Sequence, residues 1–169
     1  MTKQSVSFDF VETHLRKKRF GVLGTVGKDG KPHSTGVLYG IPPRPSPFSF
    51  YVMTGRKYQK TKNVMENAAV SFVVPFPHYY LRFVPSNCVQ FQGTAEVLPS
   101  NDPLGVATFQ QSRILRMNLQ LSSDTESIVF IRLRPDGKLH CYGLGMNVMR
   151  LRNQHTTGAY VVEVPPERL

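Results

Sequence analysis

Tryptophan is absent from this 169-residue sequence, and cysteines, acidic residues and long apolar runs are scarce. The two cysteines, Cys88 and Cys141, have neither a metal-ligand spacing nor a Cys-x-x-Cys spacing, so we expect reduced, half-buried strand thiols and no metal site. No apolar run approaches the roughly 20 residues that a membrane helix requires. The polar start, residues 1–7, lacks the apolar core of a signal peptide, and we therefore expect a cytoplasmic protein.

Basic residues outnumber acidic ones, with 21 Lys and Arg against 11 Asp and Glu and a net charge of +10. This balance favours anionic partners, and phosphorylated cofactors and nucleic acids are both candidates. The basic run at residues 16–19 favours a solvated helix end over nucleic-acid contact, because cations stabilise the C-terminal end of a helix. We do not expect a nucleic-acid partner, which would bind with steep salt dependence.

Signatures of protein-based catalysis are also missing. The sequence contains no Gly-x-Ser-x-Gly, no His-Glu-x-x-His, no P-loop and no paired acidic motif. The catalytic residues are therefore unknown, and we expect the chemistry to belong to a cofactor that the protein positions and shields.

An apolar strand runs directly into a basic helix over residues 50–67. The strand ends at Thr54, whose hydroxyl and backbone N–H can face an anion, and Arg56, Lys57 and Lys60 follow at the start of the helix. Helix N-termini attract phosphate, and lysine adds a mobile positive charge. The segment therefore predicts a phosphate cradle.

This segment resembles the FMN-binding split barrels related to pyridoxamine 5'-phosphate oxidase. Thr54 and Lys60 match the family's threonine and phosphate-lysine positions without a gap, while Met53 replaces a common tyrosine and Gln59 a common arginine. The resemblance implies FMN as the cofactor, with the deazaflavin F420 as the alternative. The cofactor-binding residues that it implies are His33, Ser34, Thr35, Leu38, Met53, Thr54, Lys57, Gln59 and Lys60.

Two further segments are similar to the same family. Residues 20–39 form two apolar runs around an Asp-Gly turn, which predicts a hairpin on its own. Residues 89–98 alternate between apolar and polar positions, like the family strand that carries Val-x-Val-x-Gly, and Cys88 stands where a flavin-facing glutamine is common. The resemblance implies a mainly β fold with flanking helices, a six-stranded antiparallel Greek-key split barrel, and a homodimer with the cofactor at the subunit interface. The chain length fits a single domain, residues 1–169.

Other periodic segments predict the remaining elements. Helices are expected over residues 8–18, from about residue 57, and over residues 102–118, with strands over 48–54, 70–74, 127–134, 139–143 and 159–164. An aromatic loop is expected over residues 75–85. Exposure of its aromatic residues, beginning with Phe76, would be costly, so they should pack on a partner subunit, a flavin ring or a substrate. The residues expected in a substrate pocket are Tyr79, Tyr80 and Arg82.

The reaction is less closely defined than the cofactor. True pyridoxamine phosphate oxidases carry a C-terminal tryptophan and an Arg-Leu segment, whereas this chain has no tryptophan and only its Arg168-Leu169 ending is similar. We therefore expect a flavoprotein oxidoreductase of unassigned small-molecule substrate and not a vitamin B6 enzyme, with an F420-dependent reductase as the alternative. Further alternatives are a non-enzymatic flavin-binding protein and a heme-binding protein, for which the candidate ligands are His78, His140 and His155.

Overall fold

The computed structural model describes residues 6–77, 86–121, 127–146 and 158–169. Within these ranges the helices are α1 (Phe8–Arg16), α2 (Gln59–Glu66), α3 (Pro103–Gln110), α4 (Arg113–Leu121) and a short 3-10 helix (Pro166–Arg168). The strands are β1 (Phe20–Val26), β2 (Pro32–Gly40), β3 (Phe50–Gly55), β4 (Ala69–Phe76), β5 (Asn87–Pro99), β6 (Ile128–Pro135), β7 (Lys138–Tyr142) and β8 (Ala159–Glu163). None of the described helices has the length and apolar character to cross a bilayer.

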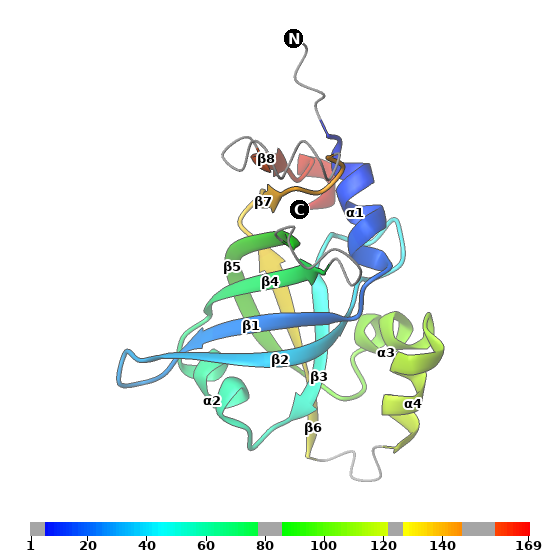
Figure 1. Ribbon diagram of the computed structural model, residues 1–169. Coiled ribbons are helices and arrows are strands. Elements are labelled where there is room, and N and C mark those ends of the chain that lie inside the picture. The colour runs from blue at the N-terminus through cyan, green and yellow to red at the C-terminus, as the bar shows by residue number, and fades with distance from the viewer. Residues whose placement is uncertain (1–5, 78–85, 122–126, 147–157) are drawn as a thin grey trace.

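The strands form one antiparallel sheet that closes on itself (Figure 1). The strand order is β4-β1-β2-β3-β6-β5-β7-β8, and an additional pairing between β4 and β5 joins the first strand to the sixth. This closing pair runs in register from Ala69↔Thr94 to Phe76↔Asn87. The result is a closed six-stranded barrel with flanking helices, which confirms the predicted split-barrel fold. β7 and β8 extend the sheet beyond β5.

Two glycines mark places where the barrel backbone leaves no room for a side chain or needs an unusual conformation. Gly30 closes the predicted β1–β2 hairpin with φ at 76°, a left-handed conformation that glycine adopts at little cost. Gly93 of β5 lies against β6, and a Cβ atom at this position would be 1.9 Å from the carbonyl oxygen of Arg134. The predicted hairpin is confirmed. The absence of a side chain at Gly93 allows β5 and β6 to pair closely.

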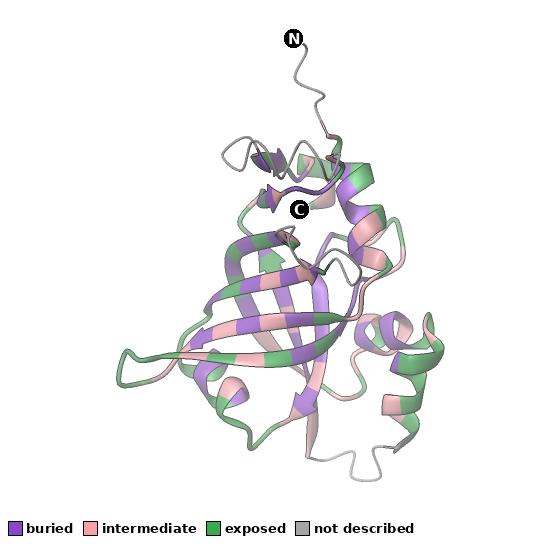
Figure 2. Cartoon of the chain, in the orientation of Figure 1, coloured by how far each residue is buried: buried purple, intermediate pink, exposed green. Residues whose placement is uncertain are grey.

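Aromatic side chains fill the inside of the barrel. Buried and exposed residues alternate along its strands (Figure 2). The ring of Phe50 has its centroid 5.1 Å from that of Phe91 and 5.3 Å from those of Phe72 and Tyr39. The Tyr39 hydroxyl donates a hydrogen bond of 2.8 Å to the carbonyl of Leu15 in α1. Because side chains fill a barrel of this size, a large planar cofactor must bind outside it.

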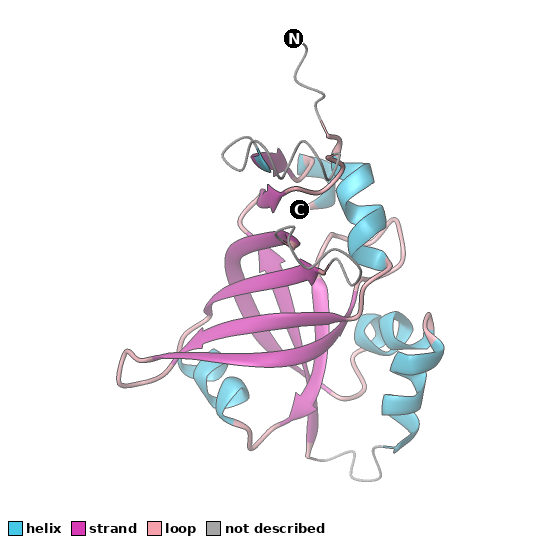
Figure 3. Cartoon of the chain, in the orientation of Figure 1, coloured by secondary structure: helices cyan, strands magenta, loops and turns pink. Residues whose placement is uncertain are grey.

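Two helices pack beside β3 and β6, where a single helix was predicted (Figure 3). Asp102 caps α3 as predicted, accepting a hydrogen bond from the backbone of Gly105. The helix then breaks at Gln111, whose side-chain amide donates to the carbonyl of Ile41 at 3.2 Å. Leu115 of α4 is buried in a cluster with Tyr51, Phe109 and Phe130. The prediction of one continuous helix over residues 102–118 was wrong, because an apolar stripe does not record a change in helix direction.

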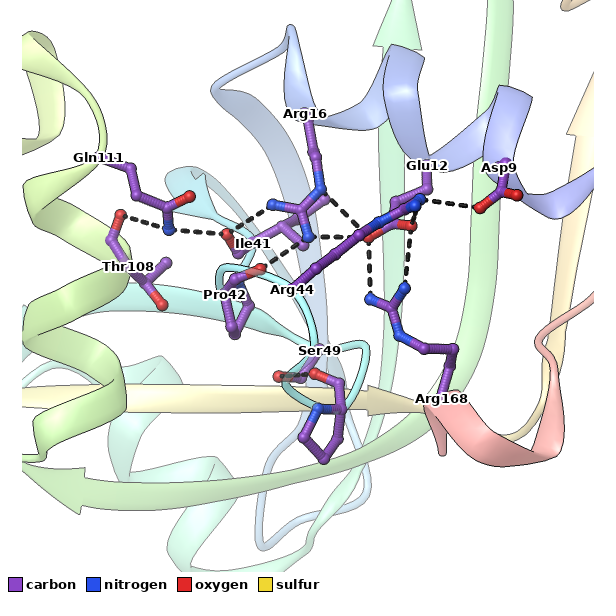
Figure 4. Close-up of polar contacts among 11 residues, drawn as sticks. Asp9, Glu12, Arg16, Ile41, Pro42, Arg44, Ser49, Thr108, Gln111 and Arg168 are labelled. Carbon is purple, nitrogen blue, oxygen red and sulfur yellow. Dashed lines mark hydrogen bonds and ion pairs between the residues drawn. The ribbon is translucent and has the colours of Figure 1, made fainter.

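A fully buried carboxylate joins α1 to the proline-rich loop that follows β2, residues 41–47, and to the end of the chain (Figure 4). Glu12 accepts hydrogen bonds from Arg16 at 2.7 Å, from Arg168 at 3.0 Å, and from Arg44. Burial has the largest single effect on the pKa of Glu12 and raises it, but the three arginines together outweigh burial and hold this pKa below its usual value. The cluster went unpredicted because its members are far apart in the sequence.

β2 and β3 pair over only a short part of their length. Their register joins Tyr39 to Val52 and Gly40 to Tyr51. The earlier part of β2 pairs with β1 alone among the described strands, while β3 continues to Gly55 with β6 on its other side. The barrel is therefore split between β2 and the end of β3, and α2 begins just beyond this end (Figure 1).

Candidate functional site

Hydrogen bonds fix the turn between β3 and α2. The backbone N–H of Tyr58 donates to the carbonyl of Gly55 at 3.2 Å, and the hydroxyl of Thr61 donates to the same carbonyl at 2.9 Å. The backbone N–H of Arg56 donates to the carbonyl of Ser127 at 2.7 Å. Residues before Gln59 are therefore held in a turn, and α2 begins two residues later than the sequence predicted.

Three cations gather at this turn. Arg56 and Lys57 are exposed, and Lys60 is half-buried in the first turn of α2. In the described part of the chain, none of the three is within ion-pair distance of a carboxylate. The first turn of α2 has no acidic residue, and no side chain caps it. The positive end of the helix and the adjacent cations are thus available to an anion.

Lys60 is the most constrained of these cations. Its ammonium nitrogen lies 4.9 Å from the centroid of the Tyr58 ring. Burial lowers the pKa of Lys60, because removal from water disfavours the charged form. A phosphate bound beside Lys60 would favour the charged form of this side chain and would oppose the effect of burial on its pKa.

A chain of hydrogen bonds through the buried side chains of Asn63 and Thr25 holds α2 against the β1–β2 hairpin. The side-chain amide of Gln59 donates to the Asn63 side chain at 2.8 Å, and Asn63 donates to the Thr25 hydroxyl at 2.9 Å. Thr25 donates to the carbonyl of His33 at 3.3 Å. The sequence predicted no role for Asn63, although its position four residues after Gln59 places both on one helix face.

The residues expected on β2 divide between the two faces of the strand. The side chains of His33 and Thr35 lie on one face, with the His33 Nδ1 atom 3.3 Å from the Thr35 hydroxyl. Ser34 and Leu38 lie on the opposite, exposed face. This division follows from the two-residue period of a strand.

The residues expected at the end of β3 lie beside the cation-rich turn. Thr54 is buried and pairs with Val129. Met53 is partly buried and packs against the apolar cluster of Tyr51, Phe109, Leu115 and Phe130. The structure therefore places Thr54, Lys57, Gln59 and Lys60 at one junction, where β3 ends and α2 begins.

The aromatic loop was predicted to begin at Pro75, but β4 continues to Phe76. Phe76 is 8% exposed and belongs to the core of this chain, so the prediction that it packs on a partner, a flavin or a substrate was wrong. The expected pocket residues Tyr79, Tyr80 and Arg82 lie outside the described residues, as do the candidate heme ligands His78 and His155.

A second feature lies on the extension of the sheet. A cavity of about 300 Å³ is lined by Cys88, Gln90, His140, Cys141, Tyr142, Ala159, Tyr160 and Val161. Burial raises the pKa of the Cys88 thiol, which disfavours its nucleophilic thiolate form. Within the described ranges, no three His, Cys, Asp or Glu side chains come together as metal ligands.

The junction of β3 and α2 fits the phosphate end of a flavin nucleotide. It provides three cations that have no carboxylate partner among the described residues, and a helix start without a side-chain cap. The exposed face of β2 adds Leu38, which is 40% exposed and apolar, as a surface for a ring. The charge and polarity of these two surfaces match the two ends of FMN, and they match F420 equally.

Known structures share this fold at low sequence identity. The heme storage protein HutZ from Vibrio cholerae is 18% identical, with a TM-score of 0.62 over 83% of this chain and 98% of that one. A heme binding protein from Mycobacterium smegmatis is 16% identical, with a TM-score of 0.66 over 98% of this chain and 64% of that one. An F420 reductase is 21% identical, with a TM-score of 0.53 over 73% of this chain and 91% of that one.

A search of curated proteins found no match. The family model for pyridoxamine 5'-phosphate oxidase, in contrast, matches residues 8–137, which run from α1 to the turn after β6 and include the whole barrel. The barrel topology and this match agree, and the protein belongs to the pyridoxamine 5'-phosphate oxidase family.

Proposed function

We propose that this protein is an FMN-dependent oxidoreductase that acts on a small molecule and works as a homodimer with the cofactor at the subunit interface. The observation that carries the proposal is the group of cations at the β3–α2 junction, which have no carboxylate partner within the described ranges, in a chain from this family. A flavin would supply the hydride or electron transfer, for which the described residues offer no protein-based catalytic group.

The residues of the junction have distinct roles in this proposal. Lys60 binds the phosphate as a charged donor, and Arg56 and Lys57 add positive potential. The Thr54 hydroxyl donates to the same group. Gln59, fixed by its hydrogen bond to Asn63, holds the start of the helix in place.

The C-terminal residues support a reaction other than pyridoxamine phosphate oxidation. Arg168 belongs to the Arg-Leu ending that is similar to the segment contacting cofactor and substrate in the true oxidases. Here its guanidinium group binds Glu12, on the side of the barrel that carries α1. An arginine committed to this buried pair is not available to a substrate, so we expect no activity on pyridoxamine phosphate.

Two other cofactors compete with FMN in this proposal. F420 would use the same cations, because its tail is also anionic. Heme is the second candidate, and the observation that favours it is the exposed imidazole of His140 at the edge of the 300 Å³ cavity.

An absorption spectrum of the purified protein, followed by titration with FMN, F420 and heme and by mass spectrometry of any released chromophore, tests the proposal. We expect a flavin spectrum with bands near about 450 nm and release of FMN. Selective binding of F420 would show that F420 and not FMN is the cofactor, and the proposed site would stay the same. A Soret band that is lost in His140→Ala would favour the heme candidate, and a protein that binds none of the three would overturn the proposal. Sedimentation equilibrium tests the dimer.

A further inference from the structure

The exposed ring of Phe20 rests on a glycine of the neighbouring strand. Phe20 is the first residue of β1 and pairs with Leu38 of β2, while Gly36 pairs with Val22. A Cβ atom at Gly36 would lie 2.9 Å from Cε2 and 3.1 Å from Cζ of the Phe20 ring. The ring therefore extends across β2 and occupies the space that any larger residue at position 36 would need.

Phe20 and Leu38 form an apolar surface at the split in the barrel. Phe20 is 49% exposed and Leu38 is 40% exposed, on the same outer face of neighbouring strands. Leu38 directly precedes Tyr39, which pairs with Val52, so Leu38 lies at the point where β2 and β3 separate.

The cation-rich turn lies on the other side of this split, at the end of β3. Thr54 follows Met53, and Lys60 follows at the start of α2. A molecule that binds across the split would have its phosphate at this turn and its apolar part toward the Phe20–Leu38 surface. Two side chains are too small a surface to account for a stable subunit interface, which buries roughly 800 Å² on each partner.

We infer that Phe20, held in place by Gly36, contacts the isoalloxazine ring of the cofactor and positions it over β2. This inference rests on the proposed function and adds a residue that the family resemblance did not identify. Aromatic side chains prefer offset or edge contacts with a second π-system, and a ring fixed against a glycine presents such a surface without needing to rearrange. Gly36 acts through Phe20 and has no contact of its own with the cofactor.

Parallel titrations with FMN and riboflavin test the inference, since riboflavin has the ring but no phosphate. In Phe20→Ala we expect affinity for both ligands to fall by the same factor, about five- to tenfold, with less quenching of flavin fluorescence. Lys60→Ala should lower affinity for FMN alone. Phe10→Ala, which truncates a 37% exposed phenylalanine on α1, is the matched control and should leave both affinities unchanged.

Gly36→Ala provides an independent variant, because its methyl group must displace the Phe20 ring. We expect it to lower both affinities, and Phe20→Leu, which keeps an apolar side chain, reports on the aromatic contact if Gly36→Ala fails to fold. Unchanged affinities in folded Phe20→Ala and Phe20→Leu would overturn the inference, and dissociation of the dimer in the same variants would assign Phe20 to the subunit contact. If the wild-type protein binds neither FMN nor riboflavin, the proposed function fails and this inference fails with it.

Discussion

Arg168 donates two hydrogen bonds to Glu12, a residue 156 positions earlier in the chain, with lengths of 3.0 and 3.3 Å. The carbonyl of Arg168 also accepts a 2.6 Å hydrogen bond from the backbone N–H of Phe48. The end of the chain is thus held by α1 and by the segment that leads into β3. Glu12 is the common acceptor, and the stability of this corner depends on its charge.

Replacing Glu12 with glutamine is expected to lower the free energy of unfolding by about 3–5 kcal/mol, the usual cost of breaking a buried ion pair. Three arginines would lose their carboxylate while keeping their charge. Urea denaturation of Glu12→Gln measures the effect. Glu66→Gln, which neutralises an exposed carboxylate on α2, is the control and should change stability little. Similar losses in both variants would contradict a special role for Glu12.

The same carboxylate makes stability depend on pH. Because the pKa of Glu12 is lower in the folded than in the unfolded protein, its contribution is full above the ordinary glutamate value of about 4.3 and is lost as pH falls through the folded pKa. We expect the unfolding free energy of the wild type to fall in this acid range, with a shallower fall in Glu12→Gln. If the unfolding free energies of the two proteins fell in parallel with pH, carboxylates other than Glu12 would account for the pH dependence.

Lys60→Ala is expected to lower FMN affinity by roughly 10- to 150-fold, since a hydrogen bond to a charged group contributes about 1.5–3 kcal/mol. The purified variant should lose its flavin during gel filtration. Lys62→Ala removes an exposed lysine from the same helix and serves as the control. Equal affinity in Lys60→Ala and the wild type would place the phosphate elsewhere.

Asn63→Ala should lower the free energy of unfolding by about 1–3 kcal/mol, because it leaves the buried Thr25 hydroxyl and the Gln59 amide without their partner. α2 would then be held less firmly, so FMN affinity should fall as well. Thermal denaturation and FMN titration of the variant measure the two effects. Gln92→Ala, at an exposed position of β5, should change neither quantity.

Gly93→Ala is expected to destabilise the barrel by at least about 1–3 kcal/mol, because the new methyl group would meet the backbone of β6, which cannot rotate away. Gly24→Ala is the matched control. Its methyl group would meet the hydroxyl of Ser71, a side-chain end that can turn aside. Comparable losses of stability in the two variants would mean that the contact with the β6 backbone is not what destabilises Gly93→Ala.

The sequence predicted the parts of this fold that local patterns encode. The Asp-Gly turn, the alternation around Phe91 and the Asp102 cap all report short-range preferences, and each of these features is present. The break at Gln111 was missed because the apolar stripe continues across it, and the contact of Gln111 with Ile41, 70 residues away, cannot be read from a local pattern. The Glu12 cluster was missed for the same reason.

The candidate site divides in the same way. The phosphate cradle could be proposed from one continuous segment, whereas the link from Asn63 to Thr25 spans 38 residues and required the packed structure. The contact between Phe20 and Gly36 requires the register of two strands, which a single sequence does not specify.

The short pairing between β2 and β3 has a consequence for how the barrel opens. These strands meet only at Tyr39↔Val52 and Gly40↔Tyr51, so separating them breaks fewer hydrogen bonds than separating β4 from β5. Amide hydrogens at this seam should exchange with solvent sooner than those between β4 and β5. A ligand that contacts both strands would link them where backbone hydrogen bonds are missing. Because such a ligand would bind the closed seam and not the open one, its binding would stabilise the closed seam.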